Sequence, residues 1–191
     1  MQSKPMIRYN ATEFERSIAF EAAVKVVLEH EGGYANDADD TGGITKYGIT
    51  LHFLKGFNID LNGDGIIDKH DIIDMTVEQA KWVYRKFIWE LHHYDRFAHQ
   101  GTATKMFDMS VNMGEAQANK LLQRAINLLK EPDIVVDGVR GEMTILAANA
   151  LDGAQLLHEL KLQAMIFYKA LVDKRPVNKK FLKGWLKRAS A

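Results

Sequence analysis

The sequence is notable first for what it lacks. Its 191 residues include no cysteine, which excludes a disulfide scaffold, a thiol nucleophile and a thiolate metal site. With only 3 prolines, it has no Pro-rich linker, and no repeat or low-complexity segment is visible. The 25 basic residues are balanced by 25 acidic ones, whereas dedicated nucleic-acid binders usually carry a basic excess. We therefore expect no nucleic-acid partner.

Long apolar runs are also missing. No run reaches the length of a transmembrane helix, and the first ten residues lack the apolar core of a signal peptide. We therefore expect no membrane insertion, synthesis in the cytoplasm and, if the protein works outside it, export by another route. A monomer is the expected state.

Helical periodicity dominates what is present. Apolar residues recur at helical spacing from Phe14 to Leu28, from Val77 to Leu91 and from Leu156 to Leu171, with further helices expected at 102–112 and 118–129. A capping box of Thr76 and Gln79 marks one helix start. Segment 44–51 is β-prone, but no hairpin is predicted. The predicted class is mainly α, with helix packed on helix.

Charge is balanced overall but uneven locally. From Lys174 to the end there are seven Lys or Arg residues and no acid. Such a run is typical of a solvated C-terminal helix, and the alternative is a contact with an anionic polymer such as the cell wall.

The segment Glu29-His30-Glu31-Gly32-Gly33-Tyr34 carries the clearest chemistry. Glu31 falls at the predicted C-terminus of an apolar helix, where the helix dipole disfavours a negative charge. Glycines beside it allow a ligand to approach closely. A glutamic acid that keeps its proton can protonate a glycosidic oxygen, while solvated aspartates on the following loop stay ionised. A turn or a cation site fits the same residues.

A family resemblance favours the interpretation of Glu31 as a glycosidase acid. The segment resembles the signature of glycoside hydrolase family 108 in this order: Glu31-Gly32-Gly33-Tyr34, Asn36-Asp37, Asp40, Gly42-Gly43, Thr45 and Gly48-Ile49-Thr50. Thr41 stands where a proline is common. The resemblance implies a lysozyme-like helical fold with a Gly-rich active-site loop, N-acetylmuramidase activity and Glu31 as the catalytic acid. Phage lysozymes repeat the order Glu, Asp, Thr, which makes Asp40 and Thr45 the further catalytic candidates.

The resemblance extends to the second half. Residues 107–114, 122–125 and 136–141, together with Thr144, are similar to the predicted peptidoglycan-binding region that follows in this family. We therefore expect a muramidase region at 1–101 and a helical peptidoglycan-binding region at 102–191, packed into one compact unit. Peptidoglycan glycan strands are the expected partner. The predicted substrate-binding residues are Tyr34, Asn36, Tyr47, Asp108 and Asn112; for the last two, a buried polar contact is the alternative.

A second motif lies at residues 58–72 and looks like an insertion. It matches the twelve-residue calcium loop, with Gly65 at the sixth position and oxygen ligands at Asp60, Asn62, Asp64, Ile66 (backbone), Asp68 and Asp71. Asp71 replaces the usual Glu of the last position. The motif predicts a structural Ca²⁺ ion with no part in bond cleavage; the alternative is a metal-free polar loop. No cofactor is expected for catalysis.

Four functions remain open from sequence. The first is hydrolysis of the β-1,4 bond between N-acetylmuramic acid and N-acetylglucosamine. The second is a non-catalytic peptidoglycan-binding or secretion-accessory module, and the third is a calcium-dependent structural or interaction protein with the Asp60 loop as a docking element. The fourth is a lytic transglycosylase, which also uses a single Glu.

Overall fold

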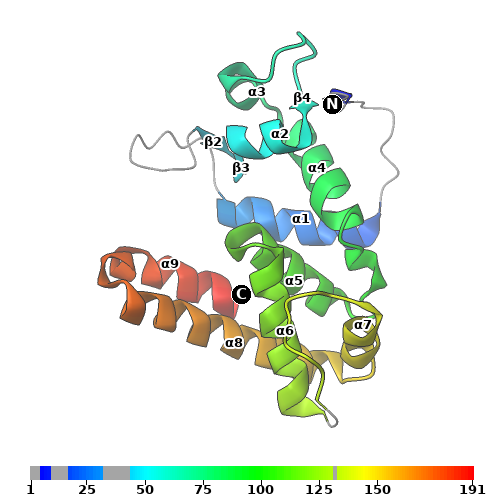
Figure 1. Cartoon of the computed structure of the whole chain (residues 1–191), viewed down its shortest axis with the longest axis vertical. Coiled ribbons are helices and arrows are strands. Elements are labelled where there is room, and N and C mark those ends of the chain that lie inside the picture. The colour runs from blue at the N-terminus through cyan, green and yellow to red at the C-terminus, as the bar shows by residue number, and fades with distance from the viewer. Residues whose placement is uncertain (1–4, 10–16, 32–43, 131–132) are drawn as a thin grey trace. The chain divides into compact units, whose positions relative to one another are not determined.

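The computed structural model describes residues 5–9, 17–31, 44–130 and 133–191. The chain divides into two compact units, Met1–His92 and His93–Ala191. Helices make up most of the described part of each unit (Figure 1), which confirms the mainly α class. In the described ranges, no helix has both the length and the apolar character needed to cross a membrane.

The first unit contains these elements: β1 (Ile7–Arg8), α1 (Ile18–Glu31), β2 (Thr45–Lys46), β3 (Ile49–Thr50), α2 (Leu51–Phe57), β4 (Ile59–Asp60), α3 (Lys69–Ile73), α4 (Val77–Tyr84) and a π-helical turn at Arg85–Glu90. Helix α1 buries one face through Phe20, Ala23, Val24 and Val27. These residues recur every three or four positions, so they line one side of the helix. Burial of this face anchors the helix, whose last residue is Glu31.

Helix α4 begins as its sequence predicts. Thr76 accepts a hydrogen bond from the Gln79 amide at 3.2 Å, and the Gln79 side chain accepts one from the Thr76 amide at 2.8 Å. This reciprocal capping box satisfies two amides that a helix start leaves without partners. The helix then carries Ala80, Val83 and Tyr84 into the core.

Two short sheets complete the first unit. Strands β2 and β3 are antiparallel, with Thr45 opposite Thr50 and Lys46 opposite Ile49. Strands β1 and β4 pair in parallel, with Ile7 opposite Ile59. The segment that was only β-prone in sequence is therefore a hairpin. Its turn residues, Tyr47 and Gly48, both have positive φ, +52° and +76°, as a two-residue hairpin turn of the primed type requires.

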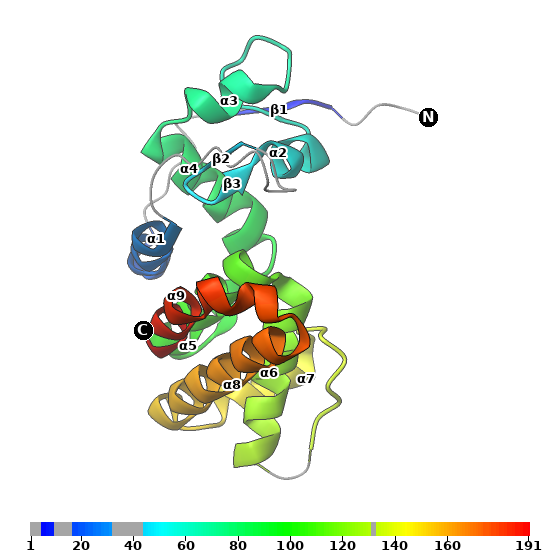
Figure 2. The ribbon, with the colours of Figure 1, turned by 90° about the vertical axis from the view of Figure 1, so that its left-hand side faces the viewer.

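The second unit is a helical bundle (Figure 2). Its elements are a 3₁₀ turn at Tyr94–Arg96, α5 (Gln100–Met113), α6 (Glu115–Leu129), α7 (Glu142–Asn149), α8 (Gly153–Lys174), a 3₁₀ turn at Pro176–Asn178 and α9 (Lys179–Ser190). Helix α8 packs against α5, α6 and α9, and its buried residues Leu156, Leu160, Ala164 and Tyr168 lie at helical spacing. Most of the basic C-terminal run lies in α9, and the lysines of this helix are exposed.

Candidate active site

Glu31 is the last residue of α1 and is half-buried. Its helix is held by the buried face described above, and Phe20 near its start packs edge-on against Trp89, with ring centroids 5.8 Å apart. On the solvent side Glu21 is ion-paired with Lys81 at 3.3 Å. Glu31 therefore lies at the end of a helix that is anchored by several contacts in the first unit.

The β2–β3 turn lies against Glu31. A Cβ atom placed on Gly48 would meet Glu31 Oε2 at 2.6 Å and the Tyr84 hydroxyl oxygen at 2.6 Å. Distances this short essentially never occur for real Cβ atoms, so a side chain at position 48 would displace the Glu31 carboxyl group or the Tyr84 hydroxyl. The positive φ of Gly48 also favours glycine at this position. The glycine thus lets the carboxyl group and the phenol approach the same point of the backbone.

Tyr84, from the end of α4, completes this cluster. Its side chain is 1% exposed, and its hydroxyl donates a 2.6 Å hydrogen bond to the Tyr47 carbonyl. This bond ties the hairpin turn to α4. The helical pattern places Tyr84 on the core face of α4, but nothing in the sequence indicates that its hydroxyl points to the Glu31 side of the unit.

The other predicted catalytic and substrate residues of the first unit divide into two groups. Thr45 and Tyr47 lie in the hairpin beside Gly48; Thr45 starts β2, opposite Thr50, and Lys46 lies 5.7 Å from the centre of the Tyr47 ring. Tyr34, Asn36 and Asp40 lie outside the described residues. The structure thus brings Glu31, Tyr47 and Gly48 together, and the roles of the remaining residues stay predictions.

Asp108 and Asn112 belong to α5 in the second unit. Asp108 is 1% exposed and accepts hydrogen bonds from the Arg188 guanidinium, with Nη2 at 2.9 Å and Nε at 3.0 Å. Asn112 accepts a 2.5 Å bond from the Tyr168 hydroxyl. Both side chains therefore make polar contacts inside this unit. Their predicted contact with substrate stays a prediction, and Asp108 would have to be uncovered to make it.

Lys105 lies one turn before Asp108 and is also buried. Its ammonium group donates a 2.7 Å hydrogen bond to the Arg188 carbonyl, so α5 holds the end of α9 through two residues. Burial lowers the pKa of Lys105 to about 8, although the charge of Asp108 acts in the opposite direction. Removal from water disfavours the charged amine more than one nearby carboxylate favours it.

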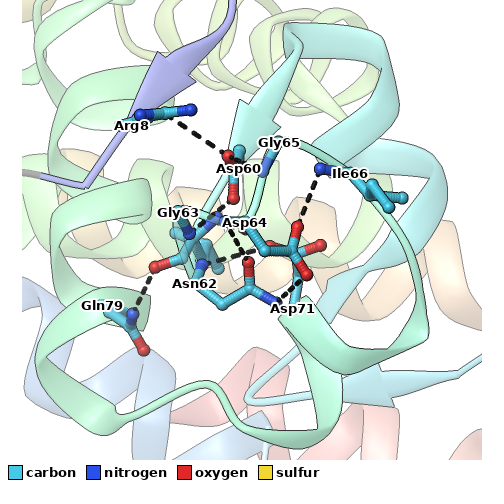
Figure 3. Close-up of polar contacts among 10 residues, drawn as sticks. Arg8, Asp60, Asn62, Gly63, Asp64, Gly65, Ile66, Asp71 and Gln79 are labelled. Carbon is cyan, nitrogen blue, oxygen red and sulfur yellow. Dashed lines mark hydrogen bonds and ion pairs between the residues drawn. The ribbon is translucent and has the colours of Figure 1, made fainter.

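The predicted calcium loop follows β4 and leads into α3 (Figure 3). Asp60 is fully buried and accepts bonds from the amides of Gly63 at 2.7 Å and Gly65 at 3.0 Å. Asp71 is 1% exposed and accepts bonds from the amides of Leu61 at 2.7 Å and Asp68 at 2.9 Å. These two carboxylates therefore organise the loop from its two ends.

The remaining predicted ligands lie on the exposed side of the loop. Asn62 donates to Asp64 at 3.2 Å, and Asp64 accepts from the Ile66 amide at 2.8 Å. Asp68 caps α3 by accepting a bond from the His70 amide. The donor set is all oxygen, which suits Ca²⁺. Over the described ranges, no three His, Asp or Glu side chains converge as a metal-binding group, so the calcium prediction rests on donor chemistry and spacing.

The described residues include surface hollows in both units. One, of about 520 Å³, is lined in the first unit by Glu21, Val24, Lys25, Leu28, Glu29 and Lys81. The other, of about 400 Å³, lies in the second unit between segment 133–139 and the start of α7. Glu31 is not among the lining residues of either of these two hollows.

Comparison with known proteins supports the family resemblance. Residues 24–114 match the family model described as glycosyl hydrolase 108, and residues 117–190 match the model described as predicted peptidoglycan domain. Among solved structures, the chain is similar to SagA of Brucella abortus, with 28% identity and a TM-score of 0.69. That match covers 90% of this chain and 89% of SagA. No curated protein matches the chain.

The two family models cover most of the chain, and the first contains Glu31, the β2–β3 hairpin and Tyr84. The second covers α6 to α9 almost completely. The domain boundary predicted at residue 101 stays a prediction. Residues 24–114 are therefore a glycosyl hydrolase 108 domain, and residues 117–190 are a predicted peptidoglycan domain.

Proposed function

We propose that the protein hydrolyses the β-1,4 bond between N-acetylmuramic acid and N-acetylglucosamine in peptidoglycan. The observation that carries this proposal is the position of Glu31, half-buried at the end of α1 against Gly48 and near the Tyr84 hydroxyl. It lies inside the segment that matches the hydrolase family. The peptidoglycan domain model in the second half supports peptidoglycan as the partner.

In this mechanism Glu31 is the general acid. It protonates the glycosidic oxygen, the bond to the anomeric carbon breaks, and water attacks through an oxocarbenium-like transition state. Asp40 activates the water or stabilises the developing positive charge, and Thr45 orients the water. Tyr34, Asn36 and Tyr47 bind the glycan.

The test compares wild type, Glu31→Gln and Glu29→Gln on purified peptidoglycan, with mass analysis of the products. Glu29 is an exposed carboxylate two residues earlier on the same helix, so it is a matched control for loss of one charge. We expect clearing with reducing N-acetylmuramic acid ends for wild type and Glu29→Gln, and none for Glu31→Gln. Anhydro ends would identify a transglycosylase, and glycan binding without clearing would identify a binding module.

We also propose that the Asp60–Asp71 loop binds a structural Ca²⁺ ion. Asp60, Asn62, Asp64, Asp68 and Asp71 would supply side-chain oxygens, and Ile66 its carbonyl. The burial of both Asp60 and Asp71 supports this, since buried carboxylates are usually paired with a cation or coordinate a metal. Arg8, 3.5 Å from Asp60, supplies one such charge. The ion would rigidify the loop and take no part in bond cleavage.

A further inference from the structure

A phenol and a carboxyl group meet at one point of the first unit. The Tyr84 hydroxyl oxygen and Glu31 Oε2 each lie 2.6 Å from the position that a Gly48 Cβ would occupy. The two oxygens are therefore no further apart than twice that distance, on the same side of the hairpin turn. Tyr84 belongs to α4 and Glu31 to α1, so two helices and one turn converge here.

We propose that Tyr84 is a positioning residue for Glu31. The inference rests on the proposed function, since it assigns Tyr84 a role in the reaction that Glu31 carries. Tyr84 does not touch the reacting atoms; it acts by holding the acid in the orientation and hydrogen-bonding state from which the proton leaves.

The direction of one hydrogen bond determines how Tyr84 acts. A phenol has a single proton, and in Tyr84 that proton is donated to the Tyr47 carbonyl at 2.6 Å. Towards Glu31 the hydroxyl is therefore an acceptor. Only a protonated carboxyl group can donate to an acceptor, so this arrangement matches the form that a general acid needs before it reacts.

The burial of Tyr84 and the backbone of the β2–β3 turn keep this hydrogen bond in place. Tyr84 is 1% exposed, so water does not compete for its hydroxyl. Its acceptor is the carbonyl of Tyr47, a non-glycine residue held at φ +52°, and the next residue is Gly48 at φ +76°. A less unusual turn would aim that carbonyl elsewhere. The turn therefore fixes the hydroxyl proton, and the absence of a Gly48 side chain leaves room for the acid.

The experiment removes the hydroxyl alone. Tyr84→Phe is compared with wild type on soluble glycan strands across the pH range in which both stay folded. We expect kcat to fall roughly tenfold, the effect of one hydrogen bond, with KM within about twofold of wild type. The alkaline limb of the pH–rate profile should move to lower pH, because the general acid loses an acceptor for its proton.

The matched control is Tyr94→Phe in the second unit. Tyr94 is also fully buried, and its hydroxyl bonds to Ser110 and Glu115. Both variants lose a buried hydroxyl and should melt at lower temperature. The pH–rate profile should move only for Tyr84→Phe. If Tyr84→Phe does not fold, 3-fluorotyrosine at position 84 keeps the shape, weakens the oxygen as an acceptor and should move the limb in the same direction.

The outcomes separate this inference from the proposed function. If Glu31→Gln is inactive and Tyr84→Phe or its fluorinated equivalent has the wild-type pH–rate profile, Tyr84 is structural only and the positioning role is wrong. If Glu31→Gln retains activity, the proposed function is wrong at its catalytic acid, and the positioning role is overturned with it. A shifted limb together with an inactive Glu31→Gln supports both.

Discussion

Each unit buries a tyrosine close to a glutamate, and the two pairs differ in where the phenol proton goes. In the second unit Tyr94 donates to Glu115 at 2.5 Å, and Glu115 is ion-paired with Arg140 at 3.0 Å. The Arg140 guanidinium lies 4.2 Å from the centre of the Tyr94 ring. In the first unit the Tyr84 proton goes to a backbone carbonyl. Glu115 thus accepts a hydrogen bond from a phenol and pairs with a cation, whereas the Tyr84 phenol proton is donated to the Tyr47 carbonyl and not to Glu31. The same residue types thus serve structure in one unit and, by our proposal, proton transfer in the other.

The strongest test of this comparison makes the same substitution in both pairs. Glu31→Gln should lower the hydrolysis rate roughly 10²–10⁴-fold, the usual contribution of a general acid, with little change in stability. Glu115→Gln should leave the rate of the folded protein unchanged. It should lower the free energy of unfolding by about 2–3 kcal/mol, because Arg140, whose side chain is 4% exposed, loses its carboxylate.

Initial rates and thermal unfolding of the two variants measure these effects. Loss of activity by folded Glu115→Gln, or a large loss of stability in Glu31→Gln, would remove the distinction between the two pairs.

The next prediction is how stability depends on pH through two buried groups of the second unit. Burial lowers the pKa of Lys105 to about 8 from its ordinary value of 10.5. Between these values the unfolded chain binds a proton that the folded chain does not, so the free energy of unfolding should rise with pH, by up to about 3 kcal/mol. Burial also raises the pKa of Tyr94 above its ordinary value of 10.0. Above pH 10 the unfolded tyrosine therefore loses its proton first, and stability should fall again.

Urea unfolding across this pH range measures the effect. Lys105→Met removes the amine and keeps most of the apolar stem, so its stability should lose the rise that begins near pH 8. A rise of equal size in the variant would assign the pH dependence to another group.

The sequence predicts local elements of the fold but not contacts between residues that are far apart in the chain. The spacing of apolar residues predicts α8, the Thr76–Gln79 capping box predicts the start of α4, and the helix predicted at 118–129 is α6. All three are local signals. Arg188 meets Asp108 across 80 residues, and no local pattern specifies such a pair. The Tyr47-Gly48 turn was missed because a tyrosine at positive φ is uncommon and typical hairpin turns carry Asn-Gly or Asp-Gly. The family motif identified Glu31, but the direction of the Tyr84 hydroxyl needs coordinates.

Calcium should stabilise the first unit, which contains the Asp60–Asp71 loop, and not the second. Binding to the folded Asp60–Asp71 loop would stabilise the protein by about 2.7 kcal/mol when free Ca²⁺ is a hundredfold above its Kd, which corresponds to a rise in Tm of a few degrees. Asp64→Ala should abolish this rise. Asp74→Ala should not, since Asp74 is an exposed carboxylate just beyond the loop. Calorimetry with Ca²⁺, Mg²⁺ and a chelator measures it. An equal Tm with Ca²⁺ and with chelator would leave a metal-free polar loop.

The smallest expected change in stability comes from two glycine substitutions, which together test the contact between the β2–β3 turn and Glu31. Gly48 and Gly63 have similar φ angles, +76° and +81°, but a Cβ at Gly63 meets no heavy atom within 4 Å. Alanine at either position should therefore cost about 1–2 kcal/mol for the left-handed backbone. Only Gly48→Ala must also displace the Glu31 carboxyl group or the Tyr84 hydroxyl, so it alone should lower kcat as well. Chemical unfolding and initial rates of both variants measure the difference. Equal rates for the two variants would mean that the acid tolerates displacement from the turn, and the close approach at Gly48 would then be a packing feature without a role in proton transfer.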